Sequence, residues 1–388
     1  MHAKECHSLF RTNTQHDVSI LINDLAAGGR PVTCMVIVFL PWLVDIANQH
    51  GIPFVFYWIQ AATIFATYYH FFHGFESLIQ AHAGEPSFTV WLPGLMALQI
   101  KDLSPFLTVT DYDSYFGSIV QLMREMFEIL DREQERNMKP RVLINTFKEW
   151  ETDALVSVSA EIETIPVGLL SKETNLSSSG YLFKEDEKKY MEWLDSKEEG
   201  SVVYISFGSM SVMKKEQIEE MVKGLKESKR PYLWVLRKDN REKELVEIEG
   251  DDDQDGNEMM VEWCSQVRVL AHKAVGCFVT HSVWNSTLES LACGVPMVCV
   301  PQWIDQGMNA KLVESLWGCG VRSDGDGDGD GVVKGEELVR CLELVMGDGE
   351  KGVEIRRKAK MWKDKALEAV SGGESSDANM KVLVEKIK

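Results

Sequence analysis

The chain has 388 residues, a formal net charge of −19 and 45% hydrophobic residues. Such an acidic chain would be repelled by a phosphate-coated polymer, and no basic run is present, so nucleic acid is not an expected partner. Length and apolar content favour two globular domains. Eight scattered cysteines without a C-x-x-C pair favour reduced thiols, and the polar opening MHAKECHSLFRTNTQHD lacks the apolar stretch of a secretory signal. A cytoplasmic location is therefore expected.

In the first half, the sequence predicts strands within PVTCMVIVFL, IPFVFYWI and RVLINT, with helical stretches between them. Doubly wound domains commonly begin with a strand, whereas a mostly polar segment comes first here. We therefore expect an incomplete first domain with an unpaired sheet edge and poor solubility. The segment 52–72 approaches the length of a membrane span, but it contains Gln60 and His70 and lacks flanking basic residues. It is interpreted as a buried strand followed by a helix, with a membrane span as the alternative, and no stable membrane insertion is expected.

From about residue 201, the short apolar runs SVVYISF, PYLWVLR, GCFVTH and PMVCVP alternate with helical stretches, and Gly294 is placed as a helix stop. Continuous apolar runs suit parallel strands that are covered on both faces. The predicted fold class is α/β, with two Rossmann-like doubly wound domains. The expected domains are 1–168 and 191–388, joined by a polar linker over 169–190, and the last helix could pack back on the first domain.

Two strand ends carry groups suited to an anion. In open α/β sheets, ligands bind beyond the carboxyl ends of the strands, where helix N-termini offer unpaired N–H groups. His281 ends one strand, and Trp284, Asn285 and Ser286 open the following helix. The second candidate is the stretch 206–209, where a glycine permits close backbone approach and a serine offers a hydroxyl. The sequence therefore predicts a phosphate site.

The segment WCSQVRVLAHKAVGCFVTHSVWNSTLESLACGVPMVCVPQWIDQ, from Trp263 to Gln306, resembles the signature box of plant UDP-dependent glycosyltransferases of family 1. The resemblance extends through WLPGL, RVLINTF, SVVYISFGSMSV and RCLELVMGDG over nearly the whole chain, and it is closest to anthocyanin 5-O-glucosyltransferases and glucose-ester-forming relatives. It implies a GT-B architecture that binds nucleotide sugar on the C-terminal domain and a lipophilic small-molecule acceptor on the N-terminal domain. UDP-glucose would be a co-substrate, and neither a cofactor nor a metal is implied.

The resemblance also implies roles for individual residues. Uracil would stack on Trp263, and the backbone at Cys264 and the side chain of Gln266 would bond to the base and the ribose. Glu289 would accept hydrogen bonds from the ribose hydroxyls. The diphosphate would be held by Ser209, His281, Asn285 and Ser286, and the sugar by Trp284, Asp305 and Gln306, of which the last favours glucose. Taken singly, such residues are more often structural, so the prediction depends on their joint spacing.

The sequence departs from the family at three places. No G-H-x-x-P motif is present, so no catalytic base is identifiable, and Ile37 stands where the supporting aspartate often lies. Val283 stands where the family has glycine. A positive φ at this residue would strain the valine by about 1–2 kcal/mol, whereas a negative φ would make it harmless.

Three functions follow in order of preference. The first is an inverting UDP-glucose-dependent glucosyltransferase acting on a hydroxyl or carboxyl of a small lipophilic acceptor, such as a flavonoid, an anthocyanin or an apocarotenoid acid. The second is a catalytically inactive homologue that retains a UDP-sugar site. The third is a calcium-binding module at 326–337, where Asp326, Asp328, Asp330, Gly331 and Glu337 match a calcium-loop pattern that a Gly-Asp repeat also produces by composition. A monomer is expected.

Overall fold

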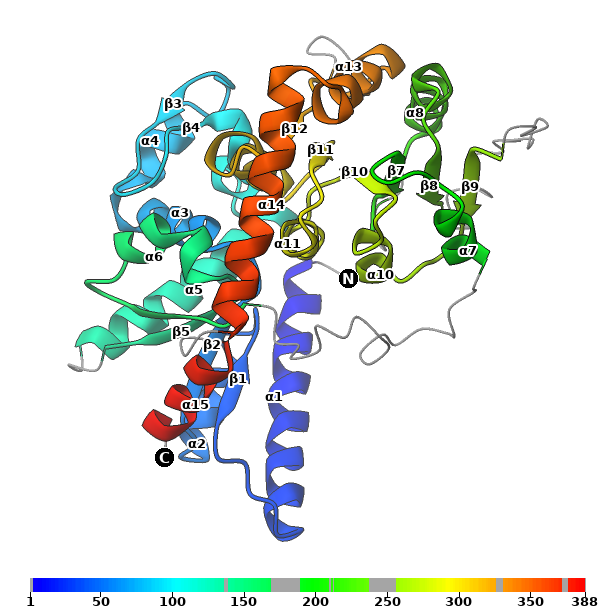
Figure 1. The fold of residues 1–388 in the computed structure, drawn as a ribbon. Helices are drawn as coiled ribbons and strands as arrows, with labels where there is room; N and C mark the ends of the chain where they lie inside the picture. The colour runs from blue at the N-terminus through cyan, green and yellow to red at the C-terminus, as the bar shows by residue number, and fades with distance from the viewer. Residues whose placement is uncertain are drawn as a thin grey trace. The chain divides into compact units, whose positions relative to one another are not determined.

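The chain divides into two compact units in the computed structural model, which describes residues 3–135, 139–168, 189–208, 211, 213–236, 256–325, 331–371 and 376–387. One unit comprises Met1–Leu170 with Ala369–Lys388, and the other comprises Ser171–Glu368. Each unit is built on its own parallel sheet, and the strands can be followed in Figure 1.

The sheet of the first unit has the order β1-β2-β5-β6, and all neighbouring pairs are parallel. Its strands are β1 (Met35–Ile37), β2 (Phe54–Trp58), β5 (Arg141–Ile144) and β6 (Glu163–Pro166). The three predicted strands of this half are confirmed. The long apolar segment consists of β2 followed by α3 (Ala62–His70), as expected from its polar interruptions. No helix among the described residues is long and apolar enough to cross a membrane.

Further elements complete this unit. They are α1 (Ala3–Ala27), α2 (Leu43–Gln49), the π-helical turn Phe71–Phe75, α4 (Glu76–Ala81), the hairpin of β3 (Thr89–Val90) and β4 (Leu98–Gln99), the 3-10 turns Ile100–Asp102, Pro105–Thr108 and Lys148–Trp150, α5 (Tyr115–Glu135), α6 (Thr152–Ser157) and α15 (Ser376–Ile387). Near the chain end, Asn379 of α15 donates from Nδ2 to the carbonyl of Pro166, at 2.7 Å.

A buried carboxylate joins the loop after β5 to the start of α3. Glu151 is 2% exposed and accepts hydrogen bonds from the backbone N–H groups of Ala62 and Thr63, both at 2.9 Å. It also accepts from the hydroxyls of Thr63 at 2.7 Å and Thr146 at 2.6 Å. Because the first backbone N–H groups of a helix have no partner inside the helix, this carboxylate acts as the N-terminal cap of α3.

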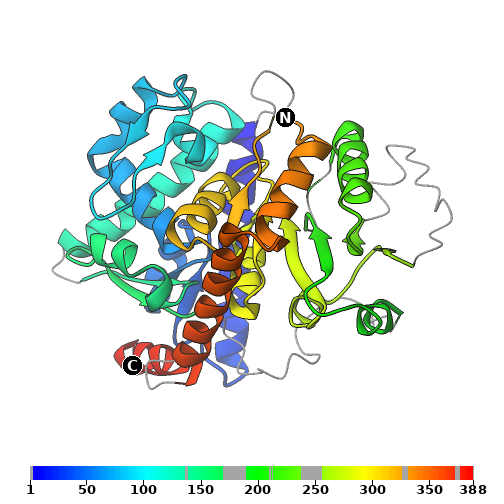
Figure 2. The ribbon, with the colours of Figure 1, turned by 45° about the horizontal axis from the view of Figure 1, so that its top comes forward.

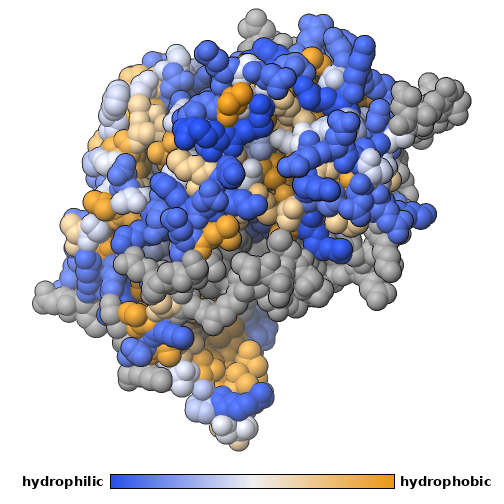
Figure 3. Space-filling view, in the orientation of Figure 1, coloured by the Kyte–Doolittle hydropathy of each residue, from blue (hydrophilic) through white to orange (hydrophobic). Residues whose placement is uncertain are grey.

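Helix α1 occupies the polar opening segment, for which the sequence pattern gave no element. Its inner face carries Val18 and Ile22, four residues apart, which pack with Ile46 of α2. Its outer face leaves four apolar side chains about half exposed: Leu9, Phe10, Ile20 and Leu21. Figure 3 shows apolar surface over the lower part of this helix. The neighbouring strand β1 is an edge of its sheet, and Val36 on it is also exposed.

The second unit contains a sheet of order β12-β11-β10-β7-β8-β9, parallel throughout. Its strands are β7 (Val202–Ser206), β8 (Tyr232–Val235), β9 (Glu258–Val261), β10 (Val275–Thr280), β11 (Met297–Cys299) and β12 (Gly320–Arg322). Its helices are α7 (Lys189–Asp195), α8 (Lys215–Ser228), α10 (Gln266–Leu270), α11 (Trp284–Cys293), α12 (Gln306–Lys311), the π-helical turn Leu312–Leu316, α13 (Gly335–Met346) and α14 (Glu350–Ser371), which ends in the first unit. The predicted doubly wound pattern is confirmed.

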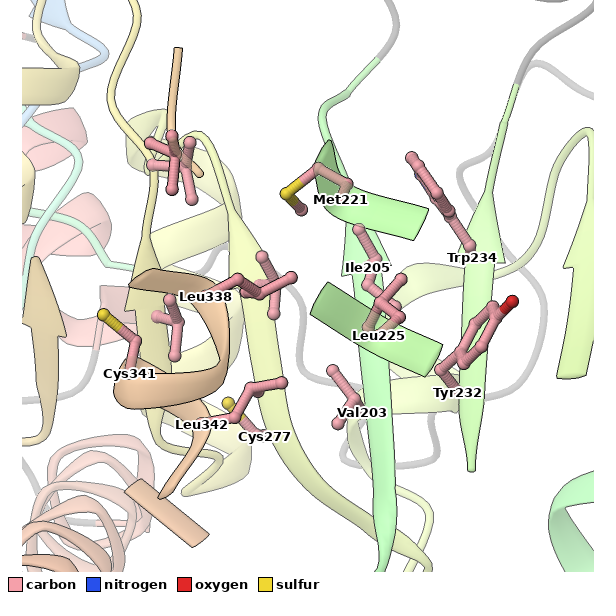
Figure 4. Close-up of a cluster of buried hydrophobic side chains, with 14 of the residues drawn as sticks. Val203, Ile205, Met221, Leu225, Tyr232, Trp234, Cys277, Leu338, Cys341 and Leu342 are labelled. Carbon is pink, nitrogen blue, oxygen red and sulfur yellow. The ribbon is translucent and has the colours of Figure 1, made fainter. Parts of the chain in front are cut away.

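One face of this sheet is covered by α8 and α13, the green and orange helices that lie side by side in Figures 1 and 2. Figure 4 shows Val203 and Ile205 of β7 in the same cluster as Leu225 of α8 and Leu338 of α13. Side chains alternate along a strand, so Tyr204, between the two β7 residues, lies on the opposite face. That face is the one from which the functional site is built.

Candidate functional site

The turns that follow β7 and β10 lie side by side, because these strands are neighbours in the sheet. Gly208, two residues beyond β7, has φ +72°, and a Cβ at this position would lie 2.9 Å from Nε2 of His281. Glycine is therefore required here both by its backbone conformation and by the nearby imidazole. The structure brings together the two segments that the sequence singled out separately, although Ser209 itself lies outside the described residues.

His281 is buried at the end of β10, with 6% exposure. Burial disfavours the charged imidazolium and lowers the pKa of His281 from 6.5 to about 4. Among the described residues, its buried Nδ1 has no hydrogen-bond partner. At neutral pH this side chain is therefore a neutral hydrogen-bonding group rather than a cation.

Val283 adopts φ −63° and ψ 147° immediately before α11, whose N-cap it forms without a side-chain hydrogen bond. The positive φ of this turn, 64°, lies instead at the preceding Ser282. Asn309 Nδ2 donates to the Ser282 carbonyl and to Asp305 Oδ2, both at 2.9 Å. The possibility of a valine strained by positive φ, which the sequence left open, is thus excluded by the geometry of the turn.

A hydrogen-bonded network connects three elements around the side chain of Gln266. Its Nε2 donates to Oε2 of Glu289 at 2.8 Å and to Oγ of Ser286 at 3.1 Å, both on α11. Its Oε1 accepts from the hydroxyl of Tyr204 at 3.3 Å, and that hydroxyl lies 3.4 Å from Sγ of Cys264. Burial raises the pKa of Glu289, and the hydrogen bond from Gln266 opposes this effect. Trp263, half buried, precedes this network in the chain.

The indole of Trp284 is 1% exposed and packs against the ring of Trp317, with ring centroids 6.0 Å apart. This aromatic ring therefore belongs to the interior of the unit, so Trp284 does not present its indole face to a sugar. The next residue, Asn285, is exposed on the first turn of α11, and Ser286 is buried.

The turn before α12 is organised by its own polar side chains. Asp305 and Gln306 are each 3% exposed. Oε1 of Gln306 accepts from the backbone N–H groups of Gln302 at 2.8 Å and of Trp303 at 3.2 Å. Trp303 is 44% exposed on this turn. The amide oxygen of Gln306 thus holds the loop, which leaves Nε2 as the end of this side chain available to a ligand.

Sequence reasoning missed two residues of these networks, Tyr204 and Asn309. The signal for the first was a single phenol within an otherwise apolar strand, and the signal for the second was its spacing of four residues from Asp305 on one helix face. Neither pattern distinguishes a site residue from an ordinary core or helix residue.

Glu337, the last residue of the calcium-loop pattern, forms hydrogen bonds with a neighbouring arginine. Both oxygens of Glu337 accept from Arg340, Oε2 from Nε and Oε1 from a terminal nitrogen, each at 2.6 Å. Residues 326–330 lie outside the described residues. Within the described ranges, no group of three or more His, Cys, Asp or Glu residues could hold a metal ion. The residue that should supply the bidentate calcium ligand therefore forms an ion pair instead.

A parallel sheet whose carboxyl edge carries a glycine turn, a buried histidine and a helix start defines an α/β nucleotide-binding unit. The family described as UDP-glucoronosyl and UDP-glucosyl transferase matches residues 180–369. The chain is 42% identical to crocetin glucosyltransferase, chloroplastic, of Gardenia jasminoides, covering 96% of this chain and 79% of that protein. It is 38% identical to anthocyanidin 3-O-glucoside 5-O-glucosyltransferase 1 of Perilla frutescens, covering 94% and 79%. The chain therefore belongs to the UDP-glycosyltransferase family.

The solved structures agree with the sequence comparisons. Os79 from O. sativa in complex with UDP matches with a TM-score of 0.82 and 28% identity, over 97% of this chain and 83% of that one. The fold is thus GT-B, as the resemblance implied, and the protein is an enzyme of a family whose co-substrate is a UDP-sugar. The comparisons lend no support to the alternative of a catalytically inactive homologue.

Proposed function

We propose that the chain transfers glucose from UDP-glucose, with inversion, to a small lipophilic acceptor. The observation that carries the proposal is the convergence of the signature-box side chains around the start of α11, next to the turn after β7. The 42% identity to a glucosyltransferase of Gardenia jasminoides supports glucose as the transferred sugar. The cytoplasmic location stays a prediction, and so does a monomer at low protein concentration.

In this proposal the donor lies along the carboxyl edge of the second sheet. Uracil stacks on Trp263 and bonds to Cys264 and Gln266, and the ribose hydroxyls donate to Glu289. The diphosphate lies at the first turn of α11, with Asn285, Ser286, Ser209 and the neutral His281 as hydrogen-bond donors. Charge develops on this diphosphate as it leaves, so donors fixed in advance lower the barrier to transfer. Asp305 and Nε2 of Gln306 would hold the glucose hydroxyls.

The choice between hydroxyl and carboxyl acceptors depends on proton removal. A phenol ionises near pH 10, whereas a carboxylic acid ionises near pH 4, so at neutral pH only the second is already a nucleophilic anion. These 388 residues contain no G-H-x-x-P motif to supply the family's base. We therefore propose that the polypeptide glucosylates carboxylic acids, such as apocarotenoid acids, faster than it glucosylates flavonoid or anthocyanin hydroxyls.

Transfer of labelled glucose from UDP-glucose to paired carboxylic and phenolic acceptors tests both statements. His281→Ala should lose UDP binding and transfer together. His272→Ala is the matched control, because His272 lies before β10 and pairs with Asp195 at 3.1 Å, away from the α11 turn. Transfer to neither acceptor class by a folded, UDP-binding chain would contradict the proposed activity, and equal rates on both classes would contradict the acceptor preference.

A further inference from the structure

We infer that Tyr204 is a positioning residue of the donor site, which acts by fixing the side-chain amide of Gln266 in one orientation. The inference rests on the proposed function, because it assigns a task to a residue behind the groups that would bind UDP. No signature-box pattern includes this strand residue.

Tyr204 is held rigidly at the centre of the second sheet. It lies on β7, is 1% exposed and stacks on Phe278 of the neighbouring strand β10, with ring centroids 4.9 Å apart and an interplanar angle of 20°. Its hydroxyl emerges at the face occupied by α10 and α11, 3.3 Å from Oε1 of Gln266. A phenol has two bonds to rotate, and here the stack fixes both, so the position of the hydroxyl is set by the sheet.

Chemistry defines the direction of each hydrogen bond in this network. An ionised Glu289 can only accept, so the amide nitrogen of Gln266 must face it. The amide oxygen must then face the opposite way, where it needs a donor. The Tyr204 hydroxyl has one proton and supplies it, while Sγ of Cys264 at 3.4 Å can donate to the phenol oxygen in turn. Tyr204 and Glu289 therefore fix the same amide from its two ends.

Without the hydroxyl, the partly buried amide oxygen of Gln266 would lose its donor. Rotating the amide would bring this oxygen against Glu289, which is tolerated only when the carboxyl carries a proton. Among the residues that the structure describes, the ionisable groups in electrostatic contact with Glu289 are Cys293 on α11 and Tyr204 itself, and burial raises the pKa of both. The thiol and the phenol therefore stay neutral as the pH falls, whereas burial raises the pKa of Glu289 and so favours protonation of this carboxyl.

The test compares Tyr204→Phe with Tyr232→Phe by calorimetric titration of UDP between pH 8 and pH 6. Tyr232 is a matched control because it is 2% exposed on the adjacent strand β8 and faces the opposite side of the sheet. Loss of one hydrogen bond to this partly buried amide should weaken UDP binding about five- to tenfold in Tyr204→Phe. The ratio of wild-type to variant affinity should also grow as the pH falls, whereas a purely structural hydroxyl would give a constant ratio. Tyr232→Phe should bind like the wild type.

A double-mutant cycle identifies Gln266 as the intermediary. Gln266→Met removes the amide at nearly constant volume, and adding Tyr204→Phe to it should cost no further affinity. Equal affinities of wild type and Tyr204→Phe would overturn the inference, as would equal losses in the two tyrosine variants or a Tyr204→Phe chain that does not fold. A folded wild-type chain that does not bind UDP would instead overturn the proposed donor site, and the inference with it.

Discussion

Substituting Val283 with a charged side chain would test whether the diphosphate of UDP lies at the start of α11. Val283 is the N-cap of this helix, has extended backbone angles and makes no capping hydrogen bond. Asp and Asn are equally good N-cap residues, so either side chain can accept from the unpaired N–H groups of the first turn. We expect both Val283→Asp and Val283→Asn to raise the free energy of unfolding by about 1 kcal/mol.

The two variants should differ sharply in UDP binding. If the diphosphate lies at this helix start, the carboxylate of Val283→Asp faces it at a distance on the order of 6 Å, about one helical turn. With an effective dielectric constant of about 20, two unit charges at that distance repel by ~3 kcal/mol. This corresponds to UDP binding about a hundredfold weaker in Val283→Asp than in Val283→Asn. Physiological salt has a screening length of about 8 Å and would leave roughly half of this repulsion, so the difference in affinity there should be about tenfold.

Urea unfolding followed by tryptophan fluorescence measures the first effect, and calorimetric titration of UDP at pH 7.5 measures the second. Equal UDP affinities in the Asp and Asn variants would refute a diphosphate at the start of α11. A loss of stability in Val283→Asn would refute the expectation that a side chain at position 283 can cap α11.

Three further predictions concern stability and association. Burial lowers the pKa of His281 to about 4, so between about pH 6.5 and pH 4 the unfolded chain binds more protons than the folded chain. Lowering the pH from 7 to 5 should therefore reduce the free energy of unfolding of the wild type by about 2 kcal/mol through this group. His281→Asn should lack this loss when urea midpoints are compared. Glu151→Gln replaces one of the two carboxylate oxygens, each of which accepts two hydrogen bonds at the α3 cap, with an NH2 donor. It should lower the free energy of unfolding by about 2–4 kcal/mol in thermal unfolding, whereas the exposed Glu149→Gln should have no effect. Because the apolar face of α1 is exposed, the chain should self-associate as its concentration rises, which sedimentation measures. The double variant Phe10→Glu with Leu21→Glu should weaken that association. A wild-type chain that stays monomeric at all concentrations would contradict this prediction.

The strands of both sheets could be predicted because parallel strands are buried on both faces and therefore have nearly continuous apolar sequences. β7, β8, β10 and β11 each lie within such a run. Helix α1 could not be predicted in the same way. It contributes only a narrow apolar stripe, with Val18 and Ile22, to the core, and the rest of its surface is polar or exposed.

The candidate site was predictable as a set of residues but not as a set of contacts. The spacing of the signature box brings Gln266, Ser286 and Glu289 into one network, although they come from two helices. The conformation of Val283 was not predictable, because it depends on where the turn takes its positive φ. That place is Ser282, whose carbonyl is bonded by Asn309 from a helix more than twenty residues away.

The two halves of this site differ in whether their polar groups already have hydrogen-bond partners. Around Gln266, both ends of the amide are bonded before any ligand arrives, so the protein has already ordered the groups expected to meet the base and ribose. At the proposed diphosphate turn, a buried atom of His281 has no partner among the described residues, and Ser282 is held in a left-handed conformation that serine rarely adopts. These features at the turn lower the stability of the folded chain, and a diphosphate that bonds to these groups would offset that loss. We therefore expect the turn after β10, rather than the Gln266 network, to supply most of the gain in stability when UDP binds.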